Sequence, residues 1–336
     1  MISVEQARER ILAGLQPTPA ELVALAEAWG RVTAAPVAAR LTQPPVDVSA
    51  MDGYALRAAD GVLGTVLHVV GSAPAGHPFT GVVGPGQAVR LFTGSVVPQA
   101  ADAILLQEDA TASGTEVRVN EAVTAGRHIR RAGQDFAAGD TVVPAGRRLT
   151  ARDIGLVAAA NHPWLAVHRR PRVAILATGD EIAMPGEPIP PGGIVSSNSH
   201  ALAALVRAAG GQPVVLPVAA DTREAVAAVA DSVHGMDMLV TTGGASVGDH
   251  DLVIESLKTR GLRLDFWQIA MRPGKPLLFG TLGPVPVLGL PGNPVSAMVC
   301  SILFLLPALG RLSGLPAAPP PTVQAIAGAA LRANDH

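Results

Sequence analysis

Residues 171–312 carry the feature that most constrains the fold, a series of unbroken apolar segments that alternate with helical ones. Residues 173–177 read Val-Ala-Ile-Leu-Ala, and similar runs lie at 213–218 and 236–241. Strands that are apolar at every position are covered on both faces, and their alternation with helices is typical of a parallel sheet. The other expected elements are helices at 199–209, 222–233 and 295–309 and strands at 264–269, 276–280 and 285–288. The sequence therefore predicts a three-layer α/β/α domain.

The first 170 residues show two other sequence patterns. Residues 3–30 show helical spacing and predict two helices, the second within 19–29. Between 47 and 143 short apolar segments are separated by glycine and proline, which predicts a small β-rich module. Its strands are expected at 65–70, 88–92, 103–107, 116–119 and 141–143. Residues 150–160 look helical again, so the module is predicted to be an insertion. We assign 1–46 with 140–170 to a helical or linker domain and 47–139 to the inserted module.

The balance of charges excludes a general attraction for nucleic acid or for an anionic membrane. There are 25 basic and 27 acidic side chains, which give a net charge of -2. Cys300 is the only cysteine, so one chain cannot form a disulfide or a zinc ribbon. The charged N-terminus lacks the apolar core of a signal peptide. The apolar run at 295–309 is shorter than the roughly 20 residues of a membrane span. We therefore expect a cytoplasmic protein.

Glycines, acidic residues and basic residues follow the predicted strands. In an open parallel sheet, ligands bind beyond the carboxyl ends of the strands. Glycines let backbone N–H groups approach an anion, and Asn293 before Pro294 predicts a helix N-terminus in the same crevice. Arg272 and Lys275 add positive charge. The carboxylates that could share a divalent cation are Glu181, Asp221, Asp249 and Asp251. This combination favours magnesium and a phosphoanhydride substrate.

Each of these signals also has a simpler structural interpretation. Asp221 and Glu224 match a helix capping box, and taken alone Asp221 fits that role better than metal binding. Asn293-Pro294 is typical of a helix start, and Glu181 could cap the turn after its strand. The nine histidines have no metal-ligand spacing. Five such loops at consecutive strand ends nevertheless favour a ligand site over five unrelated turns.

Four of these loops resemble the molybdopterin-binding domain of molybdopterin molybdenumtransferases, the gephyrin E-domain-like family, and of molybdopterin adenylyltransferases. The matching stretches are Ala177–Glu181, Thr242–Gly248, Arg272–Pro276 and Leu290–Pro294. Ser49-Ala-Met-Asp-Gly-Tyr-Ala55 resembles a signature of the molybdenumtransferases alone. Leu91–Gly94, Ala101–Ile104 and Ile129–Asp135 match them in the same order. The resemblance spans nearly the whole chain.

The resemblance implies an elongated multidomain subunit that forms a homodimer. Residues 171–316 would be the molybdopterin-binding domain, and 317–336 a linker and the start of a C-terminal β-domain that is largely absent. The implied reaction inserts molybdenum into adenylylated molybdopterin, using molybdate and Mg²⁺ and releasing AMP. Possible partners are a molybdopterin adenylyltransferase and molybdoenzyme maturation proteins. Adenylyl transfer to molybdopterin, or a non-enzymatic gephyrin-like scaffold, are the alternatives.

The resemblance also implies roles for single residues. Asp52, Asp221 and Asp251 would hold magnesium, Arg272 and Lys275 would offset phosphate charge, and Glu181 would orient water or the pterin. Thr93 and backbone amides would hold molybdate. The remaining binding residues are Arg130, Asp135, Thr178, Gly179, Gly243, Gly244, Ser246, Pro291, Gly292, Asn293 and Pro294. Gln268 and Arg272 stand where many relatives carry lysine, Gln134 where they often carry glutamate, and Thr242 where serine is frequent.

Overall fold

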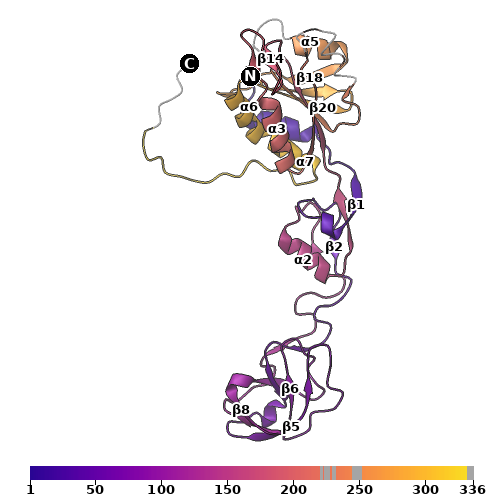
Figure 1. The fold of residues 1–336 in the computed structure, drawn as a ribbon, viewed down its shortest axis with the longest axis vertical. Coiled ribbons are helices and arrows are strands. Elements are labelled where there is room, and N and C mark those ends of the chain that lie inside the picture. The colour runs from indigo at the N-terminus through magenta and orange to yellow at the C-terminus, as the bar shows by residue number, and fades with distance from the viewer. Residues whose placement is uncertain (220–221, 223–227, 229–231, 244–251, 331–336) are drawn as a thin grey trace. The chain divides into compact units, whose positions relative to one another are not determined.

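The computed structural model describes the whole chain except residues 220–221, 223–227, 229–231, 244–251 and 331–336. It divides into two compact units, each assembled from separate stretches of the chain (Figure 1). Unit 1 comprises Met1–Ala35, Pro144–Ile154 and Trp164–His336, and unit 2 comprises Pro36–Val143 and Gly155–Pro163. The two units are described separately.

A six-stranded sheet forms the centre of unit 1. Its strands, in spatial order, are β16 (Gln212–Val215), β13 (Arg172–Ala177), β17 (Met238–Thr242), β20 (Val285–Leu290), β19 (Leu278–Leu282) and β18 (Leu262–Phe266). The first four are parallel, as the apolar segments predict. Strand β19 is antiparallel to both of its neighbours, β20 and β18, which corrects the expectation of a parallel sheet. Only Gly283 and Pro284 separate β19 from β20, and a parallel connection needs a crossover of a dozen or more residues.

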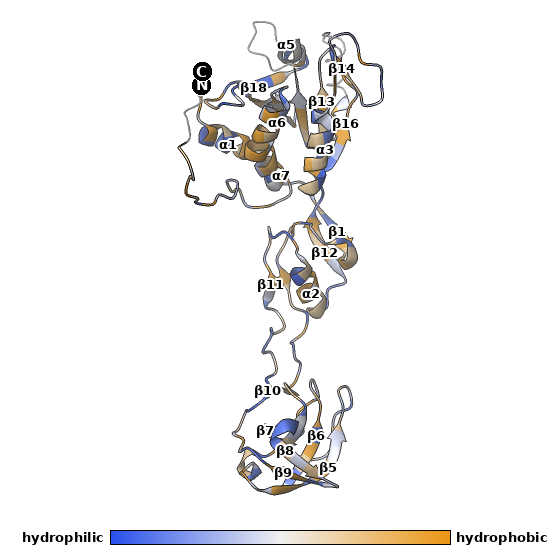
Figure 2. Cartoon of the chain, turned by 60° about the vertical axis from the view of Figure 1, so that its left-hand side comes forward, coloured by the Kyte–Doolittle hydropathy of each residue, from blue (hydrophilic) through white to orange (hydrophobic). Residues whose placement is uncertain are grey.

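Both faces of this sheet are buried, because successive side chains of a strand point to opposite faces. On β13, Val173 and Ile175 belong to one apolar core, and Ala174 and Leu176 belong to another. The first core is covered by α1 (Val4–Ala13), α3 (Asn198–Ala208) and the helix that begins at Pro294, and this last helix is largely hydrophobic in Figure 2. The second core includes Leu257 of α5 (Leu252–Thr259). The helix expected at 222–233 lies mostly outside the described residues.

The last helix is continuous from Pro294 to Leu312. It consists of α6 (Pro294–Cys300), a π-helical turn (Ser301–Leu305) and α7 (Leu306–Leu312). By length and composition alone it could cross a membrane. In the structure its residues Phe304, Leu305 and Leu309 are buried in the first core of unit 1. Cys300 is buried there too, and burial raises the pKa of its thiol to about 12. The cysteine is thus an apolar core residue.

The second helix predicted near the N-terminus is wrong. Residues Ala20–Ala24 form strand β1, which pairs antiparallel with β12 (Trp164–His168). A short 3₁₀ turn, Leu25–Glu27, follows it. Alanine, leucine and glutamate favour a helix only weakly, and pairing with a strand more than a hundred residues away overrides that preference.

Unit 2 contains a second six-stranded sheet, in the order β7-β4-β6-β5-β9-β8. Its strands are β4 (Gly53–Leu56), β5 (Val66–Ala73), β6 (Gln87–Leu91), β7 (Ala103–Leu106), β8 (Ala110–Ser113) and β9 (Glu116–Val119), with 3₁₀ turns at Ala58–Asp60 and Gln107–Asp109. The predicted strands of this region are therefore present. Two short pairs, β3 (Val48–Ser49) with β10 (Ile129–Arg130) and β2 (Val37–Ala38) with β11 (Thr141–Val143), lie outside this sheet. The helix predicted at 150–160 is α2 (Ala151–Ala159).

Candidate functional site

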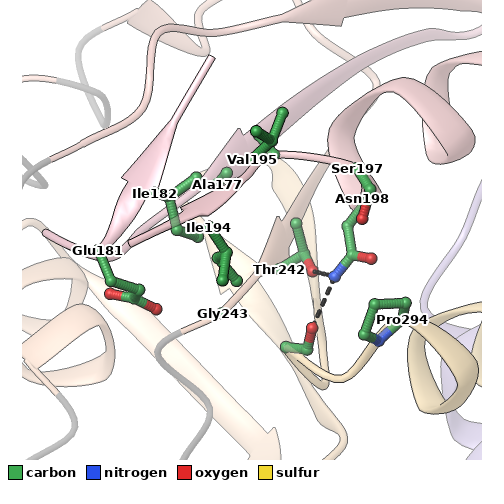
Figure 3. Close-up of a pocket in the computed structure, with 12 residues that line it drawn as sticks. Ala177, Glu181, Ile182, Ile194, Val195, Ser197, Asn198, Thr242, Gly243 and Pro294 are labelled. Atoms are coloured by element: carbon green, nitrogen blue, oxygen red, sulfur yellow. Dashed lines mark hydrogen bonds between the residues drawn. The ribbon is translucent and has the colours of Figure 1, made fainter. Parts of the chain in front are cut away.

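A pocket of about 200 Å³ opens in unit 1, beyond the carboxyl ends of three parallel strands (Figure 3). Ala177 ends β13, Thr242 ends β17, and Gly292 follows β20. The other wall is a short parallel pair, β14 (Ile182–Ala183) with β15 (Ile194–Val195). The described residues that line it are Ala177, Glu181, Ile182, Ile194, Val195, Ser196, Ser197, Asn198, Thr242, Gly243, Gly292 and Pro294. Among these described residues only Glu181 is ionisable, and the rest are apolar or neutral and polar.

Asn198 connects the loops on one side of the pocket. It begins α3, and its Nδ2 donates to Thr242 Oγ1 at 2.9 Å and to the Gly292 carbonyl at 2.8 Å, as drawn in Figure 3. It therefore fixes the ends of β17 and β20 relative to α3. Sequence reasoning missed this residue. The signal was the polar run Ser196-Ser197-Asn198 directly before the helix, which resembles an ordinary helix start.

Backbone crowding shapes the floor of the pocket at Gly243. Its φ is +88°, and a Cβ there would lie 2.5 Å from the Thr178 carbonyl oxygen. The loop after β20 also packs against Gly243, since a Cβ on Gly292 would lie 3.4 Å from Gly243 Cα. The Thr178 hydroxyl close to this position is buried, and it has no hydrogen-bond partner among the residues that the structure describes. Such a group is rare in folded proteins, but Thr178 lies behind the pocket lining and does not belong to it.

Glu181 lies across the pocket from Asn198, with Thr242 and Gly243 between them (Figure 3). It is exposed. Gly179 permits this position of the carboxylate, because a Cβ on Gly179 would lie 2.5 Å from Glu181 Oε2. The φ of Gly179 is +141°. The arrangement presents a carboxylate at one end of an otherwise neutral pocket.

Residues Pro291–Pro294 include both a helix cap and part of the pocket lining, the two roles that the sequence suggests. The side-chain oxygen of Asn293 accepts a hydrogen bond from Ser296 N at 3.1 Å, and Pro294 is the first residue of α6. The Asn293 side chain is therefore used as a helix cap. Gly292 and Pro294 nevertheless line the pocket, so the start of the helix faces it.

Arg272 and Lys275 lie on the loop between β18 and β19 and are not part of the pocket lining. Both are exposed, and neither forms an ion pair with any residue that the structure describes. Gly274 between them has a φ of +110° and packs against Cys300, whose sulfur would lie 2.7 Å from an added Cβ. Packing against the core thus fixes the loop that carries Arg272 and Lys275, whose side chains have no ion-pair partner among the described residues.

In unit 2, Asp52 and Thr93 form a close pair. Asp52 Oδ1 accepts hydrogen bonds from Thr93 N at 2.7 Å and from Thr93 Oγ1 at 2.8 Å. These bonds, with a smaller contribution from the charge of Arg90, hold the pKa of Asp52 below its ordinary value. Thr93 thus directs both its backbone N–H and its hydroxyl at Asp52, and contact between Thr93 and molybdate remains a prediction.

Arg130 and Asp135 are also paired with each other. Arg130 Nη2 donates to both Asp135 carboxylate oxygens at 2.8 Å. Arg130 belongs to β10, whose partner β3 directly precedes the Asp52 segment. Asp47 at that end of unit 2 accepts hydrogen bonds from Arg131 Nη1 at 2.5 Å and from Ala132 N at 2.9 Å. Each of these charged side chains is thus held by a defined partner.

The residues predicted to bind magnesium lie partly within the described part of the chain. Within the described stretches, no three histidine, cysteine, aspartate or glutamate side chains gather as a metal site. Asp221, Asp249, Asp251, Gly244 and Ser246 lie outside those stretches. Asp52 fits one position of a magnesium site, since it is charged and only its Oδ1 is used by the hydrogen bonds from Thr93.

Comparison with known proteins identifies the family. Residues 2–161 match the MoeA N-terminal region (domain I and II), and residues 174–311 match the family described as a probable molybdopterin binding domain. The molybdopterin molybdenumtransferase of Nostoc sp. is 38% identical over 88% of this chain and 70% of its own length. That of Haemophilus influenzae is 34% identical over 94% of this chain and 78% of its own length.

The fold agrees with these relatives. A crystal structure of the molybdopterin biosynthesis MoeA protein from Pyrococcus horikoshii aligns with a TM-score of 0.79 at 31% identity, over 93% of this chain and 81% of that one. A second structure of that protein gives a TM-score of 0.82 at 28% identity. The chain therefore belongs to the molybdopterin molybdenumtransferases, enzymes of molybdenum-cofactor biosynthesis.

Proposed function

We propose that this enzyme inserts molybdenum into adenylylated molybdopterin, with molybdate and Mg²⁺ as the other reactants, and releases AMP. The pocket beyond β13, β17 and β20 is the observation that supports this most. Its neutral hydrogen-bonding side chains, Asn198 and Thr242, suit a pterin, which carries several donors and acceptors and no fixed charge.

The phosphates of the substrate require cations and a metal. Arg272 and Lys275 are exposed and free of ion pairs among the described residues, so they are available to offset charge on a phosphoanhydride. Asp52 would be a ligand of the magnesium ion, which supplies charge stabilisation to the phosphate oxygens when bound. The other predicted ligand is Asp221 or Asp251, and both lie outside the described residues. The hydrogen bonds from Thr93 keep Asp52 charged and oriented for that role.

The proposed reaction has two steps, hydrolysis of the phosphoanhydride and insertion of molybdenum. Water attacks one phosphorus of the phosphoanhydride, the bridging P–O bond breaks, and AMP leaves with the second phosphate. Molybdate then reacts with the two dithiolene thiols: two Mo–S bonds form, one Mo–O bond breaks, and that oxygen leaves as water with the two thiol protons. In this scheme Glu181, at the end of the pocket opposite Asn198, orients the water or the pterin (Figure 3).

Mass spectrometry after incubation with adenylylated molybdopterin, molybdate and magnesium tests the assignment. We expect AMP and a molybdenum-containing pterin in equal amounts, and neither product without protein. Consumption of ATP with unmodified molybdopterin would instead identify an adenylyltransferase, which shares the α/β crevice. No turnover of either substrate would favour a gephyrin-like scaffold.

We also propose that the enzyme works as a homodimer. Three large apolar side chains of unit 1, Leu22, Trp29 and Trp164, are 68%, 68% and 54% exposed. Exposed apolar groups of this size often mark contacts with another protein. Light scattering coupled to gel filtration should give twice the chain mass of 34.2 kDa. A single-chain mass at micromolar concentration would contradict the proposal.

A further inference from the structure

A narrow cleft in unit 1, separate from the pocket described above, gathers four arginines. They are Arg31, Arg148, Arg169 and Arg170. Gly30, Val32, His168, Gly210 and Ser313 complete the lining, and none of these residues belongs to the pocket beyond β13, β17 and β20. The cleft joins the segment after β1, the link between β12 and β13, and the turn after α3.

Two of the four arginines are neutralised by carboxylates. Arg31 forms an ion pair with Glu21 and also donates to the His168 carbonyl at 2.8 Å. Arg169 donates to Asp237 from both terminal nitrogens, at 2.9 and 2.7 Å, and this interaction raises its pKa. These pairs fix the walls of the cleft.

The other two arginines have carbonyl partners only. Arg148 Nη1 donates to the Gly30 carbonyl at 3.1 Å, and Arg170 Nη1 donates to the Gly210 carbonyl at 3.3 Å. Neither forms an ion pair within the part of the chain that the structure describes. Four cations facing two carboxylates leave the cleft with an excess of two positive charges.

The two unpaired guanidinium groups converge over Gly210. Arg148 Nη1 lies 2.9 Å, and Arg170 Nη1 4.0 Å, from the position that a Cβ would take on this residue. Gly210 has a φ of +91° and follows the end of α3, and its lack of a side chain leaves the space between them open. Both arginines are half-buried. Burial, with the charge of Arg170, lowers the pKa of Arg148. Two desolvated like charges are unfavourable unless an anion joins them.

We propose that this cleft binds a doubly charged tetrahedral oxyanion such as phosphate, sulfate or molybdate. Guanidinium groups present paired N–H donors that match oxyanions, and the charge excess of two equals that of the ligand. The enclosed space is about 10 Å³, so the anion sits at the open mouth of the cleft, between Arg148 and Arg170. The bound anion would tie the link before β13 to the end of α3. This inference does not rest on the proposed molybdenum insertion.

Isothermal titration calorimetry on the full chain tests the site, with phosphate, sulfate and molybdate added separately at constant ionic strength set with chloride. We expect saturable 1:1 binding and a higher unfolding temperature in the anion. The double variant Arg148→Gln, Arg170→Gln should bind about tenfold more weakly or worse. In chloride it should unfold at the same or a higher temperature than the wild type, because the repulsion between the two guanidinium groups is gone.

Arg207→Gln is the control for the loss of an arginine outside the cleft, since it removes one positive charge from an exposed position in the last turn of α3. Its affinity should equal that of the wild type. If the double variant does not fold, Arg148→Lys keeps the charge but loses the guanidinium fork, and several-fold weaker binding is expected. Binding of all three anions, or of molybdate alone, would support the site and tell a general dianion site from one selective for molybdate. No saturable binding, or an equal loss in Arg207→Gln, would overturn it.

Discussion

Replacing Asp52 with asparagine is expected to lower turnover by about a hundredfold or more, because a magnesium ligand that stabilises developing phosphate charge is lost. The variant should fold normally. Asparagine has nearly the same shape, and its side-chain oxygen can still accept the hydrogen bonds from Thr93 N and Oγ1. Steady-state AMP release at several magnesium concentrations measures the effect. Full activity with unchanged magnesium dependence would remove Asp52 from the site.

Asp102→Asn is the matched control for this variant. Asp102 lies in the same unit and also accepts a backbone hydrogen bond, from Ala58 N at 2.6 Å, but it has no part in the proposed chemistry. Its replacement should leave turnover unchanged. An equal loss in both variants would show that unit 2 is sensitive to carboxylate removal in general.

Thr93→Val gives a second, independent measure of the state of Asp52. The two hydrogen bonds from Thr93 lower the pKa of Asp52, and valine removes the hydroxyl while the backbone N–H remains. The pKa should therefore rise part of the way back to its ordinary value. Activity that needs the charged carboxylate would then be lost at a higher pH as the solution is acidified. The acid limb of the pH profile for kcat/KM, or an NMR titration of the Asp52 carboxyl carbon, measures this shift.

Gly243→Ala is expected to weaken the binding of molybdopterin ligands by about a hundredfold or more, corresponding to roughly 3 kcal/mol. The new Cβ would lie 2.5 Å from the Thr178 carbonyl oxygen, and a backbone atom cannot move aside as a flexible side chain can. The end of β17 must shift, and with it the Thr242 hydroxyl that Asn198 holds. Fluorescence titration with molybdopterin measures affinity, and thermal unfolding measures stability.

Gly235→Ala separates steric collision from backbone strain. Its φ of +78° is close to the +88° of Gly243, but an added Cβ at Gly235 meets nothing within 4 Å. Alanine at either position adopts a conformation that costs about 1 kcal/mol or more, so both variants should lose some stability. Only Gly243→Ala should lose affinity. If Gly243→Ala binds molybdopterin as tightly as the wild type, the pocket is not the pterin site.

Several elements could be predicted from the sequence because their signals are local. The strand at 173–177 is apolar at every position, and this pattern is satisfied only where both faces of the sheet are buried, as they are for β13. The same rule placed the loops at Thr242 and Gly292 beyond the ends of parallel strands, where they meet at one pocket. The start of α6 at Asn293 and Pro294 followed from capping chemistry within four residues.

Other features depended on partners that lie far away in the sequence. Residues 20–24 have a helical composition, yet β12 offers them a ladder of hydrogen bonds, so they form a strand. Strand β19 pairs antiparallel with β20 because the two-residue turn between them allows no crossover, which apolar patterning alone does not reveal. Asn198 gained its role only when Thr242 and Gly292 were folded against α3.

The sequence by itself determined which segments become buried strands, which glycines and prolines end them, and which family the chain resembles, because each depends on residue type at short spacing. Only the tertiary structure decided what the polar side chains do. It turned Thr93 toward Asp52, joined Arg130 to Asp135, and left Arg148 and Arg170 together over Gly210 with no carboxylate partner among the described residues. The physical reason is that a hydrogen bond or ion pair depends on atoms a few ångströms apart in space, and folding brings such atoms together from positions 5 to 41 residues apart in the first two of these pairs.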